Sequence, residues 1–267
     1  PKIIHYIWFG GNPLPEEAVR CINSWKKYCP EYEIKEWNES NFDINACEYI
    51  KEAYLAKKWA FVSDYARLAV LVEYGGIYMD TDVEVLKPLD EFLELEAFSG
   101  FENEKDVPTG IMACTKGHPF FAELLKEYDS LHFIDGSGGY DLTTNVTRIT
   151  NACTKVGLLR NNTKQTVSGF TLFPRDYFCP LNSQTGMLDI TDNTYTIHWF
   201  SGSWKTVKEK AVHNKAKELA NKFPGVMGKV LSSCYEGTFK VVDTLQHGGI
   251  RSLNTRIKRY LSKRKEN

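Results

Sequence analysis

Two carboxylates separated by one residue follow a short apolar stretch of the chain. Residues 73–82 read EYGGIYMDTD, so an apolar helix ends at two glycines, a short strand follows, and Asp80 and Asp82 come last. Alternate residues of a strand face the same side, which predicts that the two carboxylates lie about 7 Å apart in Cα position. Carboxylate oxygens bind Mg²⁺ and Mn²⁺, and these cations keep positions for phosphate oxygens. The pair indicates either a clamp for a metal-bound diphosphate or two solvated aspartates.

The helix before this strand carries a second pair of charged side chains. Residues 59–74 have apolar side chains at helical spacing, and Gly75 supplies a stop signal. Asp64 and Arg67 are three residues apart, so they share one face of the helix. They form either a surface ion pair or, because this helix runs directly into the Asp80 strand, part of the same pocket.

Two later segments carry further candidates for chemistry. Residues 136–141 (GSGGYD) form a glycine-rich loop before a helix that we expect over 142–156, so Asp141 either caps that helix or faces the pocket. His198 stands near the end of a strand expected over 194–199, before the loop 201–204 (SGSW). A single histidine is usually a core or surface residue, but this loop could close over a ligand.

The elements that must position these residues alternate between strands and helices. A strand over 2–9 ending at two glycines, a helix over 15–29 and a strand over 31–37 form a βαβ unit. Such a unit predicts a parallel sheet with ligands at the carboxyl ends of its strands. The remaining predicted elements are strands over 83–86, 97–101, 110–114 and 171–180, and a helix over 118–131.

Charge divides the chain into two parts. Residues 205–267 hold 15 of the 33 Lys and Arg and 5 of the 34 Asp and Glu, a net of +10, which leaves 18 − 29 = −11 for residues 1–204. We therefore expect a catalytic domain over 1–204 and a basic helical extension over 205–267. Within the extension, residues 250–261 form a basic amphipathic stripe, which indicates either contact with an anionic membrane surface or a helix docked on its own domain. No nucleic-acid-binding motif accompanies the charge.

Cysteine usage and hydropathy indicate the compartment. The seven cysteines are odd in number and contain no C-x-x-C pair, which argues against a disulfide framework or a thiolate metal site. We find no leader-like N-terminus and no apolar run of membrane-spanning length. We expect a cytoplasmic protein, at most peripheral at the inner face of the membrane.

Four motifs in their order resemble glycosyltransferase family 32. They are IHYIWFGG at residues 4–11, SDYAR at 63–67, YGGIYMDTD at 74–82 and the late histidine followed by GSW at 202–204. The family carries a sugar-binding Asp-x-Asp region and includes bacterial capsule transferases, yeast initiating mannosyltransferases and, more distantly, clostridial glucosylating toxins. The resemblance is close over about residues 1–90 and looser up to Trp204.

The resemblance implies a GT-A fold, which is a Rossmann-like nucleotide-sugar-binding α/β fold with a mostly parallel central sheet. It also implies a nucleoside-diphosphate sugar as donor, a divalent cation (Mn²⁺ or Mg²⁺) and transfer with retention of configuration. The acceptor would be a glycan or a lipid-linked oligosaccharide, as in the synthesis of a capsule or surface polysaccharide.

The family's site residues carry over position by position. Trp8 would stack on the nucleobase, and Asp64 and Arg67 would hold ribose or sugar hydroxyls. Asp80 and Asp82 would bind the metal and the donor, with His198 as a third metal ligand. Ser203 and Trp204 would belong to a loop that closes on the diphosphate and excludes water. An oxygen near the oxocarbenium-like sugar would stabilise it, and Asp141 and Asn145 are the candidates.

Two other function classes compete with this interpretation. A nucleotidyltransferase or phosphotransferase could use the same Asp-x-Asp metal site, but it would be expected to need a basic phosphate-binding loop near the first strand, and residues 10–13 (GGNP) contain no basic residue. A non-catalytic glycan- or lipid-binding adaptor on this fold is disfavoured because Asp64, Arg67, Asp80 and Asp82 are all present.

Overall fold

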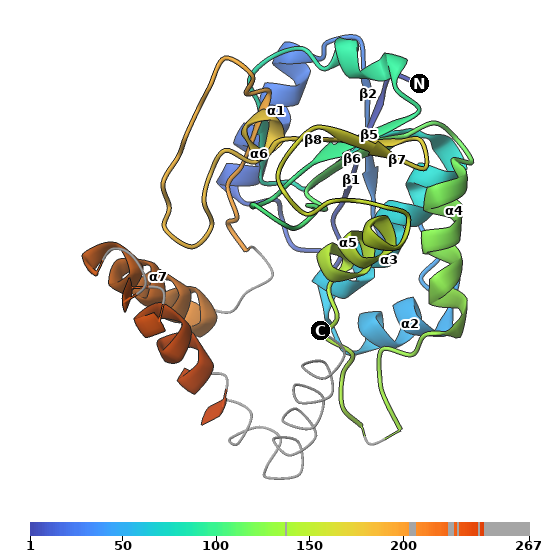
Figure 1. The fold of residues 1–267 in the computed structure, drawn as a ribbon. Coiled ribbons are helices and arrows are strands. Elements are labelled where there is room, and N and C mark those ends of the chain that lie inside the picture. Colours follow the sequence, from blue (N-terminus) through green and yellow to red (C-terminus); the bar gives the residue numbers. More distant parts are fainter. Residues whose placement is uncertain (137, 203–206, 224–226, 229, 240, 243–267) are drawn as a thin grey trace. The chain divides into compact units, whose positions relative to one another are not determined.

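The computed structural model (Figure 1) describes residues 1–136, 138–202, 207–223, 227–228, 230–239 and 241–242. The chain divides into two compact units. The first comprises Pro1–Asn182 and Met187–Trp204, and the second comprises Ser183–Gly186 and Lys205–Asn267. The predicted roles of the two segments, catalytic for 1–204 and membrane-facing for 205–267, remain predictions.

A seven-stranded sheet forms the centre of the first unit, in the order β2-β1-β3-β6-β5-β8-β7. Strand β1 is parallel to both β2 and β3, β6 is antiparallel to β3 and β5, β8 is parallel to β5, and β7 is antiparallel to β8. Five of these strands therefore run one way, while β6 and β7 run the other way. The bounds are β1 (Ile3–Ile7), β2 (Glu33–Trp37), β3 (Gly76–Met79), β5 (Ala97–Gly100), β6 (Ile111–Cys114), β7 (Gln165–Val167) and β8 (Phe170–Phe173). The predicted α/β class with a mostly parallel sheet is confirmed.

Each face of the sheet has its own apolar core, because successive strand residues point to opposite faces. Tyr78 packs with the core that contains residues of α2 (Glu48–Leu55), α3 (Trp59–Tyr74), α4 (Pro119–Lys126) and α5 (Asn145–Lys155). Its neighbours Ile77 and Met79 pack in the other core, with Trp25 of α1 (Glu16–Tyr28). Figure 1 shows α2 to α5 together on one side of the sheet. Strand β3, which leads into Asp80, is thus buried on both faces.

A second, two-stranded sheet joins distant parts of the sequence. Strand β4 (Val83–Val85) pairs antiparallel with β9 (Thr196–His198), and Val83 lies opposite His198. This pairing brings the late histidine beside the segment that carries Asp80 and Asp82.

Most predicted elements are confirmed, and some of their bounds are shorter than predicted. The helix over 59–74 is α3 to the residue, and the segment predicted as one helix over 118–131 is α4 followed by the 3-10 turn η2 (Glu127–Ser130). The strand predicted over 171–180 is wrong in its second half, where β8 ends and helix α6 (Arg175–Phe178) begins. Pro174 lies between them, and a proline has no N–H to donate to a sheet ladder.

Beyond the short stretch Ser183–Gly186, the described residues of the second unit are almost all helical. Helix α7 (Val207–Lys222) is followed by helical residues 230–239, and His213 lies 3.0 Å from Glu236. Among the described residues we find no helix with the length and apolar character that crossing a membrane requires. The basic helix predicted over 250–261 lies outside the described residues.

Candidate functional site

Asp80 and Asp82 lie in a tight turn between β3 and β4. The backbone N–H of Val83 donates to the carbonyl of Asp80 at 3.0 Å, and the N–H of Asp80 donates to the carbonyl of Gly110 at 2.8 Å. The expectation that the two carboxylates share one face of an extended strand is therefore wrong, since β3 ends at Met79. They converge because the chain turns between them.

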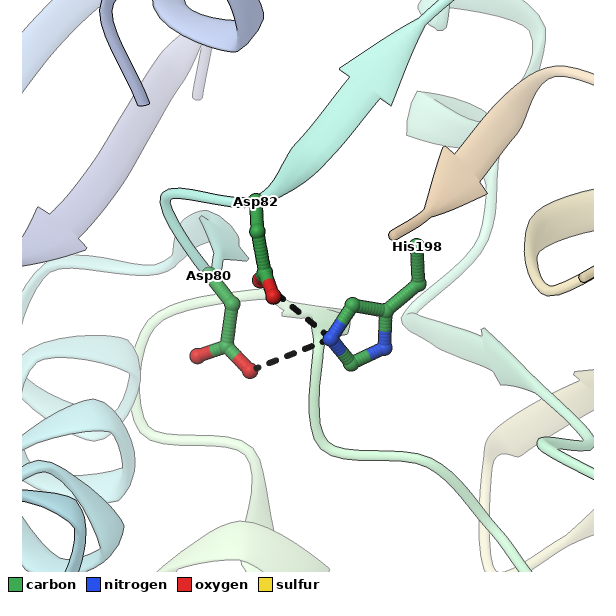
Figure 2. Close-up of side chains that lie close together, drawn as sticks. All are labelled: Asp80, Asp82 and His198. Atoms are coloured by element: carbon green, nitrogen blue, oxygen red, sulfur yellow. Dashed lines mark ion pairs between the residues drawn. The ribbon is translucent and has the colours of Figure 1, made fainter. Parts of the chain in front are cut away.

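His198 completes a cluster with these two carboxylates (Figure 2). One ligand atom from each of Asp80, Asp82 and His198 lies within 4.8 Å of the others. The Nε2 atom of His198 is 3.3 Å from Oδ1 of Asp82 and 3.9 Å from Oδ2 of Asp80. Two carboxylate oxygens and an imidazole nitrogen are a donor set that suits Mn²⁺ or Mg²⁺ with open positions for further oxygen ligands. The geometry thus brings all three predicted metal ligands together.

The other oxygen of Asp82 is held by the chain that follows His198. Its Oδ2 accepts the backbone N–H of Ser201 at 2.9 Å and the Ser201 hydroxyl at 3.0 Å. Burial acts to raise the pKa of Asp82, but His198 and the Ser201 donors outweigh it and hold this pKa well below its usual range. Burial lowers the pKa of His198, while the charge and hydrogen bond of Asp82 raise it well above the ordinary value. In the metal-free protein the two form an ion pair.

Arg67 lies between two carboxylates behind this cluster. Its Nη2 atom is 3.4 Å from Oδ1 of Asp64 and 3.4 Å from Oδ1 of Asp80, and its Nη1 donates to the carbonyl of Thr109 at 2.7 Å. Asp80 Oδ1 also accepts the Tyr78 hydroxyl at 2.6 Å. The prediction that the Asp64–Arg67 face borders the Asp80 site is therefore confirmed in its geometry, and the roles in donor binding remain predictions.

Burial sets the ionisation of this pair. Burial raises the pKa of Asp64 to about 6, although the charge of Arg67 and the N–H of Asn145 oppose that shift. For Arg67, burial lowers the pKa, but Asp80, Tyr78 and Asp64 outweigh it, so the guanidinium stays charged. Arg67 is therefore a fixed positive charge, only 5% exposed, beside the carboxylates of Asp64 and Asp80.

The two residues predicted to stabilise the sugar have other partners. Asn145 is buried: its N–H donates to Oδ2 of Asp64, its side-chain amide donates to the Asp64 carbonyl, and its Oδ1 accepts the Tyr128 hydroxyl. Asn145 therefore supports Asp64, and the roles predicted for Asn145 and Asp141 beside the sugar remain predictions. Asp141 accepts the Arg148 guanidinium at 2.6 Å. It does not cap the helix, because α5 starts three residues later than predicted, where Thr144 accepts the N–H of Thr147.

Three predicted donor-binding residues remain, of which the structure describes only Trp8. Trp8 follows β1, is partly exposed, and donates through Nε1 to the carbonyl of Asn12 at 2.6 Å. Since β1 and β3 are parallel, Trp8 lies at the same edge of the sheet as Asp80. Ser203 and Trp204 lie outside the described residues, so their predicted place in a closing loop stays a prediction.

Residues that the sequence did not single out also border the site. Glu102 follows β5, which runs in the same direction as β3; burial raises the pKa of its carboxyl, which also senses the charges of His198, Asp106 and Asp80. The parallel-strand rule that pointed to Asp80 applies equally to the end of this strand and could have found it. The Thr109–Gly110 backbone had no such signal, and Ser201 was expected only as part of the 201–204 loop, because the contacts of both are made with chain segments far apart in sequence.

Comparison with known proteins agrees with this geometry. Residues 15–99 match the model of the glycosyltransferase sugar-binding region containing the DXD motif, a stretch that includes Asp64, Arg67, Asp80 and Asp82. Residues 15–99 are therefore similar to the sugar-binding region of this glycosyltransferase family. This match confirms the predicted resemblance to that family. The architecture agrees with the GT-A fold that the resemblance implies.

Two curated relatives illustrate the range of this family. Inositol phosphoceramide mannosyltransferase 3 of Schizosaccharomyces pombe is 30% identical over 139 residues, which cover 50% of this chain and 38% of that protein. The human alpha-1,4-N-acetylglucosaminyltransferase is 34% identical over 97 residues, which cover 35% of this chain and 27% of that protein. The chain thus matches well under half the length of these two relatives. Among solved structures, the galactosyltransferase LgtC is similar with 14% identity, a TM-score of 0.41, and coverage of 84% of this chain and 97% of that one.

Proposed function

We propose that this chain is a metal-dependent retaining glycosyltransferase that moves a sugar from a nucleoside-diphosphate donor, a UDP-sugar, to a glycan or lipid-linked acceptor. The observation that carries the proposal is the cluster of Asp80, Asp82 and His198 at the carboxyl edge of a mostly parallel sheet, inside the DXD region. This is the edge at which α/β sheets bind their ligands.

The donor set of the cluster fits a hard divalent cation. Asp80 Oδ2, Asp82 Oδ1 and His198 Nε2 face one another, while the second oxygen of each aspartate is held by the protein. Bound Mn²⁺ or Mg²⁺ would neutralise the charge that develops on the departing diphosphate. The protein's own contribution is to hold these three ligand atoms in place before the donor arrives.

The fixed charges beside the cluster support donor binding. Arg67 is charged and buried next to Asp80, and its partner Asp64 is held by Asn145 from a different helix. We propose that Asp64 and Arg67 position the ribose or the transferred sugar through its hydroxyl groups, because a planar guanidinium and a carboxylate form directional hydrogen bonds. Trp8, at the same sheet edge, would offer its ring face to the nucleobase.

Two observations bear on the acceptor and the cellular role. The name of the fission-yeast relative pairs mannosyl transfer with inositol phosphoceramide, a lipid. The net charge of +10 in residues 205–267 suits an anionic lipid surface. We propose an acceptor at the inner face of a membrane, in capsule or surface polysaccharide synthesis, with the basic segment near the lipid headgroups.

The test is a panel of nucleotide sugars, each added with Mn²⁺ and with EDTA. A donor at about 100 times its Kd should stabilise the fold by about 2.7 kcal/mol, a rise in melting temperature of a few degrees. We expect a shift that needs Mn²⁺ and one nucleotide family, together with release of the matching nucleoside diphosphate. UDP- and GDP-sugars are both included, because the relatives are named for different sugars.

Two variants make the result specific to the cluster. Asp82→Ala should abolish both the shift and the release, whereas Glu94→Ala, which removes an exposed carboxylate elsewhere, should leave both unchanged. A shift that is independent of Mn²⁺ and persists in Asp82→Ala would overturn the metal site. Absence of any shift or turnover with every donor would overturn the proposed function.

A further inference from the structure

The imidazole of His198 has close neighbours at one face and at its second nitrogen. The Phe200 ring stacks on it, with centroids 4.1 Å apart and planes at 27°. Its Nδ1 lies 3.9 Å from the sulfur of the buried Cys179, while its Nε2 faces Asp80 and Asp82. Only 9% of the residue is exposed.

Gly110 also lies directly against this imidazole. A Cβ atom added at Gly110 would lie 2.6 Å from Nδ1 and 2.7 Å from Cε1 of His198. Its backbone φ is not in the left-handed region, so the reason for a glycine here is space and not conformation. The same short segment holds the other charged groups of the site, since Gly110 accepts the N–H of Asp80 and Thr109 accepts Arg67.

Phe200 is held in a costly backbone conformation. Its φ is +53°, a region that bulky side chains rarely occupy. Such strain persists only where surrounding contacts fix it, and it is found most often at functional sites. The next residue, Ser201, donates both its N–H and its hydroxyl to Asp82. The strained residue therefore lies in the short segment between His198 and the residue that holds Asp82.

We propose that Gly110 and Phe200 are positioning residues that clamp the imidazole of His198 in the orientation required to bind the divalent cation with Asp80 and Asp82. This inference rests on the metal site of the proposed function and adds the residues that orient its third ligand, His198. A histidine that binds a metal is normally oriented by a hydrogen bond from its other nitrogen to a carboxylate, a carbonyl or water. Within the described part of the chain, Nδ1 of His198 has the weak contact to Cys179 as its hydrogen-bonding partner, so steric confinement must do most of the orienting.

The size of the effect follows from the distances. A carbon atom needs about 3.4 Å from its neighbour, so alanine at position 110 requires the ring to move by about 3.4 − 2.6 = 0.8 Å. Metal–ligand distances tolerate about 0.2 Å. The Phe200 ring, the Cys179 sulfur and Asp82 already lie close around the imidazole, so a ring displaced by this methyl carries Nε2 away from its position.

The experiment measures Mn²⁺ binding without any donor, by the electron paramagnetic resonance signal of free Mn²⁺. Gly110→Ala should bind Mn²⁺ about 10- to 100-fold more weakly than the native protein, the range expected when a metal ligand loses its orienting partner. Gly237→Ala is the matched control, because its added methyl meets no atom within 4 Å. Phe200→Ala removes the ring that stacks on His198 without introducing a clash. It should also weaken the binding of Mn²⁺.

A double-mutant cycle separates the clamp from a general structural effect. In a His198→Ala background, Gly110→Ala should cause no further loss of Mn²⁺ affinity, because the ring with which the methyl clashes is gone. The same background also relieves the clash, so the double variant should unfold in urea like His198→Ala alone. Far-UV circular dichroism checks that each single variant is folded.

The outcomes distinguish the clamp from the proposed function. If the native protein binds Mn²⁺ and Gly110→Ala binds it equally well, the clamp is overturned and the transferase proposal stands. If the loss persists in the His198→Ala background, Gly110 acts through its backbone contact with Asp80 and the clamp is again overturned. If the native protein binds no Mn²⁺, the metal site and the clamp fail together.

Discussion

Replacing Asp64 with asparagine should remove a pH dependence from the stability of the metal-free protein. Burial raises the pKa of this carboxyl to about 6 from its ordinary 3.8, despite the opposing charge of Arg67. The folded state therefore binds the Asp64 proton more tightly than the unfolded chain does. This contribution to stability is fully present below the unfolded pKa of 3.8 and is lost as the pH rises through about 6.

The magnitude follows from the shift. The difference between about 6 and 3.8 is about 2 units, and each unit corresponds to 1.36 kcal/mol, so the native protein should lose about 3 kcal/mol from this group across that window. Asparagine keeps an oxygen that can accept the N–H of Asn145. It has no proton to release, so its stability should lack this loss.

The assay is urea unfolding in EDTA at several pH values between about 4 and about 7, on the native protein and on Asp64→Asn. Other titrating groups contribute equally to both curves, so the difference between the two free energies of unfolding isolates Asp64. Equal urea m-values would show that the two proteins unfold over the same surface. If the free energy of unfolding changes with pH in the same way for both proteins, the reasoning is refuted, because burial then does not raise the pKa of Asp64.

Three further predictions concern the site and its support. Asp82→Ala should abolish stabilisation by Mn²⁺ and lower the metal-free stability by about 1–3 kcal/mol, because Ser201 loses its acceptor; melting with Mn²⁺ and with EDTA measures both effects. Trp8→Ala should raise the donor KM by the equivalent of about 1–3 kcal/mol of stacking, and an unchanged KM in steady-state kinetics would place the base elsewhere. Burial lowers the pKa of His5, whose ring accepts from Trp37 and donates to the carbonyl of Gly75. Relative to His5→Phe, the native protein should therefore lose stability as the pH falls below about 6.5, and identical pH profiles in urea unfolding would contradict this.

Local patterns were sufficient to predict the elements around the site. The apolar spacing of residues 59–74 and the stop at Gly75 define α3, and both signals lie within the helix itself. The position of Asp80 at the carboxyl edge followed from the βαβ order of the first 37 residues. The turn that brings Asp80 and Asp82 together could not be predicted, because alternation along a strand was assumed to continue past Met79.

Contacts between distant segments could not be predicted from spacing. The bonds that join Asn145 to Asp64, 81 residues earlier in the sequence, left no signal in the spacing of either residue. Likewise, His198 was assigned as a ligand by family resemblance, while the pairing of β4 with β9 is what places it there. Gly110 gave no signal, because the need for a residue without a side chain arises only once the His198 ring lies against it.

The pairing of charges suggests how the site remains folded without its cation. Asp80 directs one oxygen to Arg67 and Tyr78, and Asp82 directs one oxygen to Ser201, which leaves the other oxygen of each facing His198. Every buried carboxylate of the cluster therefore has a partner within the protein, so the fold does not depend on the metal to neutralise it. A cation needs to replace only the interactions of His198. The oxygens that would bind it are already oriented by partners on their other side, which is the preorganisation that an electrostatic catalyst requires.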